Sequence, residues 1–142
     1  MPPADTDRPR TVLILDDDAS VRTTLARTLA LYDYHVLEAG DAQGAFRVLT
    51  EYSEPIDLIL CDLVLPGLGG REAANTLLAR RPEARIVYIS GYSTHDSFRR
   101  SLEESGVPFL GKPFEIAELL RLIDEVLRGE PDEGADGSEN GS

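Results

Sequence analysis

Five short apolar segments alternate along the chain with five longer segments of helical periodicity, and this alternation limits the possible folds more than any other feature. The apolar segments lie at residues 11–15, 35–39, 56–61, 85–90 and 107–110. The first, third and fourth are almost continuously apolar and contain several β-branched residues, which is typical of parallel strands covered on both faces. A chain of this kind is expected to form an open parallel sheet with helices on both sides.

The two remaining apolar segments have the character of edge strands. The segment 35–39 mixes polar and apolar residues, and the segment 107–110 contains Pro108, which has no N–H to donate within a sheet. With these strands at the edges and right-handed crossovers, the expected strand order is 2-1-3-4-5. The sequence therefore predicts an α/β fold, a flavodoxin-like doubly wound sheet of five parallel strands with five helices.

The helices are predicted from apolar residues that recur every three or four positions. The residues that carry this period are Val21, Leu25, Leu29 and Tyr32 in the first helix, Ala42, Ala45, Leu49 and Tyr52 in the second, Ala74, Leu77 and Leu78 in the third, and Ile116, Leu119, Leu120, Ile123 and Leu127 in the fifth. The fourth, over 94–104, has only Phe98 and Leu102 as large apolar side chains. We expect it to be the least firmly packed helix.

The two ends of the chain differ in composition from the rest. Residues 129–142 contain five acidic residues, no basic residue and no large apolar side chain, and residues 1–10 also lack an apolar segment. Such segments cannot bury enough apolar area to offset the entropy lost on ordering. We therefore expect a disordered arm over 1–10, one folded domain over 11–128 and a disordered acidic tail over 129–142.

The charge and the apolar content exclude several classes of function. The chain has 26 acidic and 14 basic residues, a net charge of −12, whereas nucleic-acid binding requires a basic face. No apolar run approaches the roughly 20 residues of a membrane span, and the first ten residues do not form a secretory signal. The single cysteine, Cys61, rules out an internal disulfide and a cysteine zinc site. These features predict a cytoplasmic protein with no membrane or nucleic-acid partner.

Polar residues follow the carboxyl ends of the predicted strands. They are Asp16, Asp17 and Asp18 after the first strand, Asp62 after the third, Ser90 after the fourth and Lys112, the one lysine of the chain, after the fifth. In open α/β sheets the ligand site lies beyond these ends, where the strand order reverses. We therefore expect these residues to meet in one crevice beside the first and third strands.

The residue types in this crevice favour phosphoryl chemistry. Asp17 and Asp62 face each other across the central strands, and close carboxylates are unfavourable unless a cation lies between them. Mg²⁺ is a suitable cation, and Lys112 adds a second positive charge. A carboxylate could then act as nucleophile toward a phosphoryl group that Ser90 helps to bind. Taken singly, each residue has a simpler explanation, and Asp18 can simply cap the next helix.

Four segments with these residues resemble the receiver domain of two-component response regulators. They are ILDDDASVR at 14–22, LILCDLVLPGLGG at 58–70, YISGY at 88–92 and FLGKPF at 109–114. The resemblance covers residues 11–128 and is closest in character to receivers attached to hybrid histidine kinases. It implies a signalling switch, not an enzyme, which takes a phosphoryl group from a sensor histidine kinase or a histidine phosphotransfer protein and signals to a downstream protein.

The resemblance implies a role for each acidic residue of the crevice. Asp62 would be the phosphoacceptor. Mg²⁺ would be bound directly by Asp17, by Asp62 and by the backbone carbonyl of Val64, and Asp16 would act through a metal-bound water.

The resemblance also implies roles at the fourth and fifth strands. Ser90 and Lys112 would contact the phosphoryl group, and Phe109 would be the aromatic residue that changes position on switching. The Lys112–Pro113 peptide bond is expected to be cis, because the preference of such bonds for trans is only about 0.5–1 kcal/mol and the family uses this device to aim the lysine.

Three alternatives remain open at this point. In a haloacid-dehalogenase-type phosphatase Asp16 would be the nucleophile, but Asp62 would have no role and the required later acidic pair is missing. A flavin or nucleotide binder would need a phosphate-binding loop, whereas the first loop, DDDAS, repels phosphate. A receiver that binds partners without phosphorylation would have no use for the complete set of Asp17, Asp62, Ser90 and Lys112.

Overall fold

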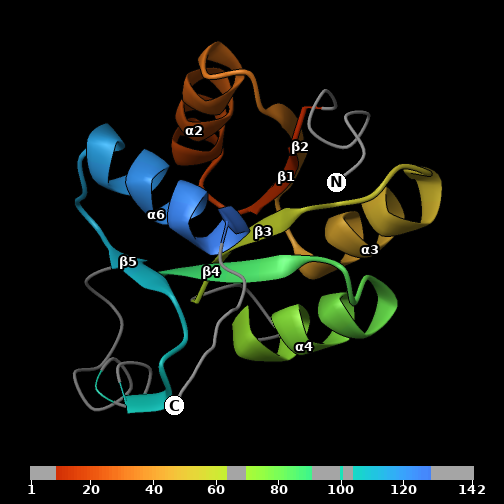
Figure 1. Ribbon diagram of the computed structural model, residues 1–142. Coiled ribbons are helices and arrows are strands. Elements are labelled where there is room, and N and C mark those ends of the chain that lie inside the picture. The colour runs from red at the N-terminus through yellow and green to blue at the C-terminus, as the bar shows by residue number, and fades with distance from the viewer. Residues whose placement is uncertain (1–8, 64–69, 91–99, 101–103, 129–142) are drawn as a thin grey trace.

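One five-stranded parallel sheet forms the centre of the computed structural model, which describes residues 9–63, 70–90, 100 and 104–128. The strands are β1 (Thr11–Leu15), β2 (His35–Ala39), β3 (Leu58–Asp62), β4 (Arg85–Ser90) and β5 (Phe109–Gly111). Their order, β2-β1-β3-β4-β5, confirms the predicted topology and both predicted edges (Figure 1).

Two strands begin later than the sequence predicts. β3 starts at Leu58 and β5 at Phe109, each two residues after the start of its apolar segment. Pro108 therefore lies just outside β5, where its carbonyl oxygen accepts a hydrogen bond from the backbone N–H of Tyr88 at 3.1 Å. A proline can accept in this way but cannot donate, which explains why regular pairing starts only after it.

Four of the five predicted helices lie in the described part of the chain. They are α2 (Ala19–Leu31), α3 (Ala42–Glu51), α4 (Gly70–Arg80) and α6 (Ile116–Arg128). The fourth predicted helix, 94–104, falls mostly outside the described residues, so its weak packing stays a prediction. Aspartates cap two of the helices: the carboxylate of Asp18 accepts from the N–H groups of Ser20 and Val21, and that of Asp41 from Gly44.

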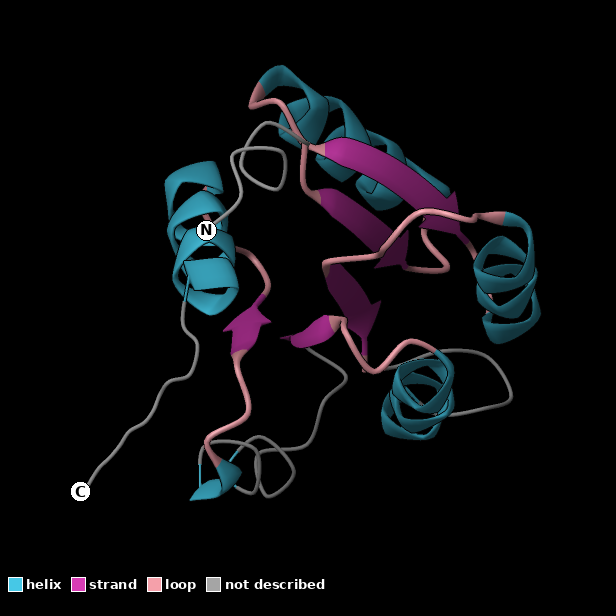
Figure 2. Ribbon diagram, turned by 45° about the vertical axis from the view of Figure 1, so that its right-hand side comes forward, coloured by secondary structure: helices cyan, strands magenta, loops and turns pink. Residues whose placement is uncertain are grey.

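The helices form two layers, one on each face of the sheet (Figure 2). In β1, Val12 and Ile14 pack with α2 and α6, whereas Leu13 and Leu15 pack with α3 and α4. All four side chains are fully buried. Burial of such a side chain contributes roughly 1.5–3 kcal/mol before chain entropy is counted, which explains why both faces of this central strand are apolar from Val12 to Leu15.

The parallel register brings the carboxyl ends of the strands to one edge of the sheet. Leu15 of β1 pairs with Ala39 of β2 and with Cys61 of β3, while Ser90 of β4 pairs with Gly111 of β5. The loops after β1, β3 and β5 therefore all start at this edge. The end segments 1–10 and 129–142 lie almost entirely outside the described residues, and their disorder stays a prediction.

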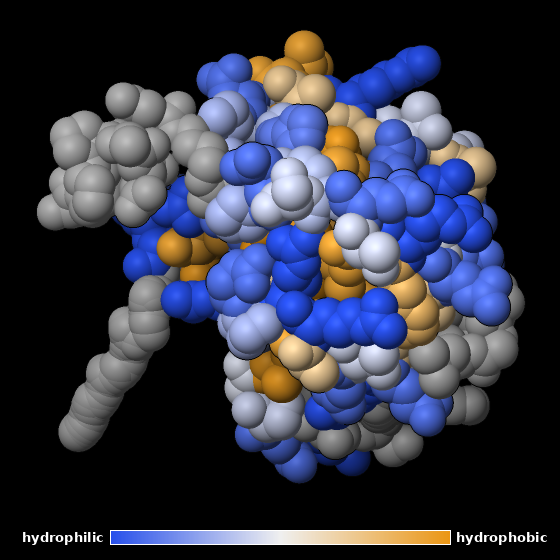
Figure 3. Space-filling model, turned by 90° about the vertical axis from the view of Figure 1, so that its right-hand side faces the viewer, coloured by the Kyte–Doolittle hydropathy of each residue, from blue (hydrophilic) through white to orange (hydrophobic). Residues whose placement is uncertain are grey.

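The surface seen in Figure 3 is covered mostly by hydrophilic side chains, with apolar ones in small groups between them. Among the described residues, the most exposed large apolar side chains are Leu31 and Tyr32 at the end of α2. None of the helices in this part of the chain is long and apolar enough to cross a bilayer.

Candidate functional site

Three carboxylates meet where the strand order reverses between β1 and β3. One oxygen from each of Asp16, Asp17 and Asp62 lies within 4.8 Å of the other two. Asp16 is fully buried, Asp62 is 7% exposed and Asp17 faces solvent. The structure therefore brings together the three acids that the sequence placed in one crevice. Their mutual repulsion makes the site selective for a cation.

Asp16 is held firmly by its surroundings. Its backbone N–H donates to the carbonyl of Ala39 at 3.2 Å, and its Oδ1 accepts from the N–H of Asp18 at 2.9 Å. Asp18 itself serves as the N-cap of α2, as predicted. The backbone hydrogen bond from Val21, followed by the bond from the Ser20 side chain, lowers the pKa of the Asp18 carboxyl. The Asp18 carboxylate therefore caps α2 and is not one of the acids that converge in the crevice.

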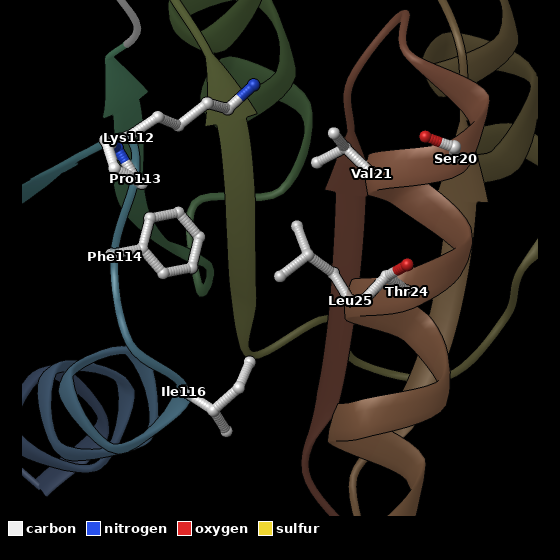
Figure 4. A pocket seen from close by; sticks show the side chains of 8 residues that line it. All are labelled: Ser20, Val21, Thr24, Leu25, Lys112, Pro113, Phe114 and Ile116. Carbon is white, nitrogen blue, oxygen red and sulfur yellow. The ribbon is translucent and has the colours of Figure 1, made fainter.

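Lys112 supplies the positive charge of the site. Its Nζ lies 3.3 Å from Oδ2 of Asp16 and 3.8 Å from Oδ2 of Asp62, and its side chain is 25% exposed. Its backbone N–H donates to the carbonyl of Ser90 at 2.7 Å, which continues the pairing of β4 with β5. The Lys112–Pro113 bond is cis, as predicted. In Figure 4 the lysine side chain reaches from the end of β5 across the sheet, away from the Phe114 ring.

Ser90 carries a buried hydroxyl that has no partner among the residues the structure describes. The side chain is 1% exposed, and its Oγ is the buried side-chain polar atom that finds no hydrogen bond in the described part of the chain. An unsatisfied buried polar group costs about 1–3 kcal/mol, and such groups call for a functional explanation. At the end of β4, beside the charged crevice, this hydroxyl is available to a ligand.

The donor set fits Mg²⁺. The ion is hard, prefers oxygen ligands and usually retains several waters beside one or two carboxylates. Asp17 and Asp62 offer those carboxylates, and the exposure of Asp17 leaves one side open to water. Val64 lies outside the described residues, so its predicted carbonyl ligand stays a prediction.

Phe109 lies half-buried in β5 and packs against the apolar cluster that includes Tyr88. The two residues are partners in the register of β4 with β5, and Ser90 follows Tyr88 by two positions. Since side chains alternate along a strand, Ser90 and Phe109 face the same side of the sheet. The predicted switch residue and the Ser90 hydroxyl therefore lie on one face of the sheet, and the movement of Phe109 stays a prediction.

Cys61 is a core residue, as the sequence predicted. It is fully buried, and burial raises the pKa of its thiol to about 12, with further contributions from the charges of Asp62 and Asp16. The thiol is therefore protonated at neutral pH and takes no part in the polar chemistry next to it.

An apolar groove of about 370 Å³ opens beside Lys112, between the start of α2 and the loop that leads into α6. Figure 4 shows the Phe114 ring on one side of the groove and Val21 and Leu25 on the other. The residues that line it are Ser20, Val21, Thr24, Leu25, Lys112, Pro113, Phe114 and Ile116. A partner that approaches the crevice from this side would meet an apolar surface.

One residue of the site was missed by the sequence reasoning. The guanidinium of Arg22 donates to the backbone carbonyl of Asp16 at 2.7 Å. The only available signal was a basic residue in the first turns of the helix that follows the acidic loop, and a solvated charge explains that pattern equally well.

The comparisons with known proteins agree on one family. Residues 12–124 match the response regulator receiver domain. The chain is 36% identical over 122 residues to the transcriptional regulatory protein PdtaR of Mycobacterium tuberculosis, a match that covers 85% of this chain and 58% of PdtaR. It is 30% identical over 118 residues to the sensor kinase CckA of Brucella abortus, which covers 82% of this chain and 12% of CckA. The chain thus spans only part of the length of these relatives.

A solved structure shows the same likeness. The response regulator protein from Burkholderia pseudomallei, solved with a phosphorylated aspartic acid, a calcium ion and citrate, matches with a TM-score of 0.68 and 26% identity. The match covers 84% of this chain and 66% of that one.

These findings do not favour the phosphatase alternative. Its nucleophile would be Asp16, which is fully buried and has both carboxylate oxygens engaged, one by Asp18 and one by Lys112. The matched family, the strand order and the converging acids all support a receiver domain instead. The chain belongs to the receiver domain family of response regulators in two-component signalling.

Proposed function

We propose that the chain accepts a phosphoryl group on Asp62 from a phosphohistidine of a sensor histidine kinase or a histidine phosphotransfer protein. The observation that carries the proposal is the position of Asp62, close both to the acids of the loop after β1 and to the Nζ of Lys112, with the Ser90 hydroxyl, which has no partner among the described residues, at the end of the next strand. The phosphorylated aspartic acid of the Burkholderia pseudomallei regulator supports it.

In the proposed transfer, a carboxylate oxygen of Asp62 attacks the phosphorus atom of the donor. The new O–P bond forms as the N–P bond of the phosphohistidine breaks, and the imidazole nitrogen keeps the electron pair and takes up a proton. Lys112 stays close enough to neutralise a phosphoryl oxygen, and Ser90 donates a hydrogen bond to another. Each charge-assisted hydrogen bond of this kind contributes roughly 1.5–3 kcal/mol.

The proposed metal ligands are Asp17, Asp62 and the carbonyl of Val64, with Asp16 acting through a water. Bound Mg²⁺ would supply charge neutralisation for the phosphoryl oxygens. Lys112 contributes a positive charge 3.8 Å from Asp62, so the carboxylate can hold a phosphoryl group without a large excess of negative charge.

The proposed switch starts at Ser90. When its hydroxyl turns toward the phosphoryl group, it leaves space on the side of the sheet that Phe109 also faces. Phe109 can then move inward, and the segment 94–104 adjusts to it. The phosphoryl group biases two packings that already differ little in free energy, which is a population shift rather than a new fold.

The proposed partners follow from charge and surface. The apolar groove beside Lys112 offers the phosphoryl donor a contact surface at the mouth of the crevice. The net charge of −12 argues against nucleic acid as a partner. We propose a cytoplasmic signalling switch that assists its own phosphorylation and slow dephosphorylation but converts no separate substrate, and that signals to a downstream protein.

Treatment of the protein with acetyl phosphate and Mg²⁺, followed by peptide mapping, tests the proposal. We expect the phosphoryl group on Asp62. Modification at Asp16, or at no acidic residue of the crevice, would overturn it.

A further inference from the structure

Arg22 connects the acidic loop after β1 to the end of β2. Its NH1 donates to the backbone carbonyl of Asp16 at 2.7 Å, and its Nε lies 3.4 Å from Oε1 of Glu38. The arginine side chain is 21% exposed and the Glu38 side chain 42%, so the contact to the carbonyl is partly shielded from water whereas the ion pair is open to it on the Glu38 side. In addition, the backbone N–H of Arg22 donates to the carbonyl of Asp18 at 2.9 Å. Arg22 therefore holds both ends of the loop, Asp16 through its side chain and Asp18 through its main chain.

The carbonyl that accepts from Arg22 belongs to the peptide group between Asp16 and Asp17. Since a peptide group is planar, a hydrogen bond to its oxygen fixes the orientation from which both side chains extend. On the other side of this loop, the N–H of Asp16 is bound to the carbonyl of Ala39. The loop is thus anchored to β2 twice, once directly and once through the Arg22–Glu38 pair.

Gly40 leaves the space that the guanidinium occupies. A Cβ atom at this position would lie 3.1 Å from NH1 of Arg22 and 3.7 Å from its central carbon. Any larger residue would press on the guanidinium. The glycine at the end of β2 and the arginine in α2 therefore fit together beside the acidic loop.

We infer that Arg22 is a positioning residue for the cation site: it holds the Asp16–Asp17 peptide so that the carboxylate of Asp17 faces that of Asp62. The inference rests on the proposed function, since it concerns the same Mg²⁺ site. This role requires an arginine, because its planar guanidinium can donate to the Asp16 carbonyl and contact the Glu38 carboxylate at the same time, whereas the ammonium group of a lysine is a compact point charge.

The inference makes a prediction opposite in sign to that of simple electrostatics. Arg22 is a cation near three carboxylates, so removal of its charge alone would strengthen the binding of Mg²⁺. Loss of a positioning contact would weaken it. Residues that orient metal ligands without touching the metal typically contribute about 10- to 100-fold to metal affinity, and the contact to a backbone carbonyl belongs at the low end of that range.

Mg²⁺ titration of the full chain, followed by amide chemical shifts, separates these cases, and the same spectra report whether each variant is folded. We expect Arg22→Ala and Arg22→Lys each to raise the Kd for Mg²⁺ about tenfold. Arg27→Ala is the matched control, because Arg27 lies on the exposed side of the same helix and loses the same charge. Its Kd should stay within about twofold of the wild type, since exposed charges are screened.

A Kd that is unchanged or lower in Arg22→Ala, or restored to the wild-type value in Arg22→Lys, would overturn the inference. If Arg22→Ala does not fold, Gly40→Ala serves instead: it crowds the guanidinium without a change in charge and should raise the Kd several-fold, and an unchanged Kd would count against the inference. Where both fold, their effects should not add, because both act through one contact.

The failure of the proposed function would look different. In that case the wild type itself would show no Mg²⁺ binding, or binding that Asp17→Asn leaves unchanged, and the inference would fall with it. Normal wild-type binding with unaffected Arg22 variants would overturn the positioning role alone.

Discussion

The ammonium nitrogen of Lys112 lies 3.3 Å from a carboxylate oxygen of the buried Asp16 and 3.8 Å from a carboxylate oxygen of Asp62. One cation therefore serves two carboxylates, and Asp17 adds a third negative charge within 4.8 Å. Asp16 accepts in addition the N–H of Asp18. The crevice retains an excess of negative charge that a divalent cation can balance.

Substitution of Lys112 by methionine should destabilise the protein, and Mg²⁺ should partly restore its stability. Loss of one partner leaves Asp16 buried without a counter-charge; because the lysine side chain is 25% exposed, we expect the free energy of unfolding to fall by less than the roughly 3–5 kcal/mol of a fully buried pair. Urea unfolding with and without Mg²⁺ measures both effects, and Mg²⁺ should stabilise the variant more than the wild type.

The control for this experiment is Arg128→Met, which removes an exposed partner of Asp124 and should cost less than about 1 kcal/mol. An Lys112→Met variant as stable as the wild type, or one that Mg²⁺ does not stabilise further, would show that the lysine does not neutralise the crevice.

Ser90→Ala should separate stability from ligand binding. Because the Ser90 hydroxyl has no partner within the described chain, its removal should leave the free energy of unfolding unchanged or raise it by up to about 1 kcal/mol. The affinity for beryllofluoride, a phosphoryl mimic, should fall roughly tenfold, which corresponds to one hydrogen bond.

Ser90→Thr retains the hydroxyl and should bind beryllofluoride much more tightly than the alanine variant. Beryllofluoride binding at the wild-type level in Ser90→Ala would argue that the hydroxyl is only a packing feature. The amide spectra from these titrations also test the switch: we expect changes at Phe109, and a silent Phe109 would count against its proposed movement.

Cys61 should resist alkylation in the folded protein. With its pKa raised to about 12 by burial and the neighbouring carboxylates, almost no thiolate exists at pH 8. Iodoacetamide should therefore react at least roughly a thousandfold more slowly than it does in urea, where the pKa returns to about 8.5. Rapid modification of the folded protein would show that β3 opens or that the thiol is accessible.

The same pKa shift has a consequence for stability. The folded state favours the protonated thiol of Cys61. The stabilisation that results from this preference is fully present at pH values below the pKa of the thiol in the unfolded chain. That contribution is lost as the pH rises toward about 12, so the free energy of unfolding should decline over this alkaline range.

A substitution in the groove beside Lys112 should slow phosphoryl transfer from a protein donor but not from a small-molecule donor such as acetyl phosphate. Thr24 is exposed at its edge, and Thr24→Arg would fill the apolar space with a charged side chain. Phosphotransfer from a histidine phosphotransfer protein that labels the wild type should slow at least about tenfold, as expected for the loss of an interface contact. Labelling by acetyl phosphate should be unchanged, because Thr24 does not reach the crevice. Equal slowing with both donors would mean that the substitution disturbs the site itself.

Much of this architecture could be predicted from the sequence because burial on both faces leaves a clear signature. β1 is apolar from Val12 to Leu15 because these side chains alternate between two helical layers, and Asp18 caps the start of α2 as its position after the strand predicts. The convergence of the acids followed from strand order alone, since the carboxyl ends of parallel strands lie together.

Other features depend on contacts that no local pattern encodes. The start of β5 lies two residues later than predicted because an apolar segment does not show at which residue pairing with β4 begins; before Phe109, the carbonyl of Pro108 accepts a hydrogen bond from Tyr88. Arg22 was missed because its two partners come from separate segments, the Asp16 carbonyl from the loop after β1 and Glu38 from β2, and the space beside Gly40 exists only once β2 and α2 are packed. That the Ser90 hydroxyl has no hydrogen-bond partner among the described residues likewise becomes visible only in the folded structure.

The central claim is that Asp62 accepts the phosphoryl group, and intact-mass measurement after incubation with acetyl phosphate and Mg²⁺ tests it most directly. The wild type should gain one phosphoryl group, Asp62→Asn should gain none, and the matched control Asp33→Asn, altered in the turn before β2 at the opposite end of the sheet, should be labelled like the wild type. Equal labelling of Asp62→Asn and the wild type would contradict the account.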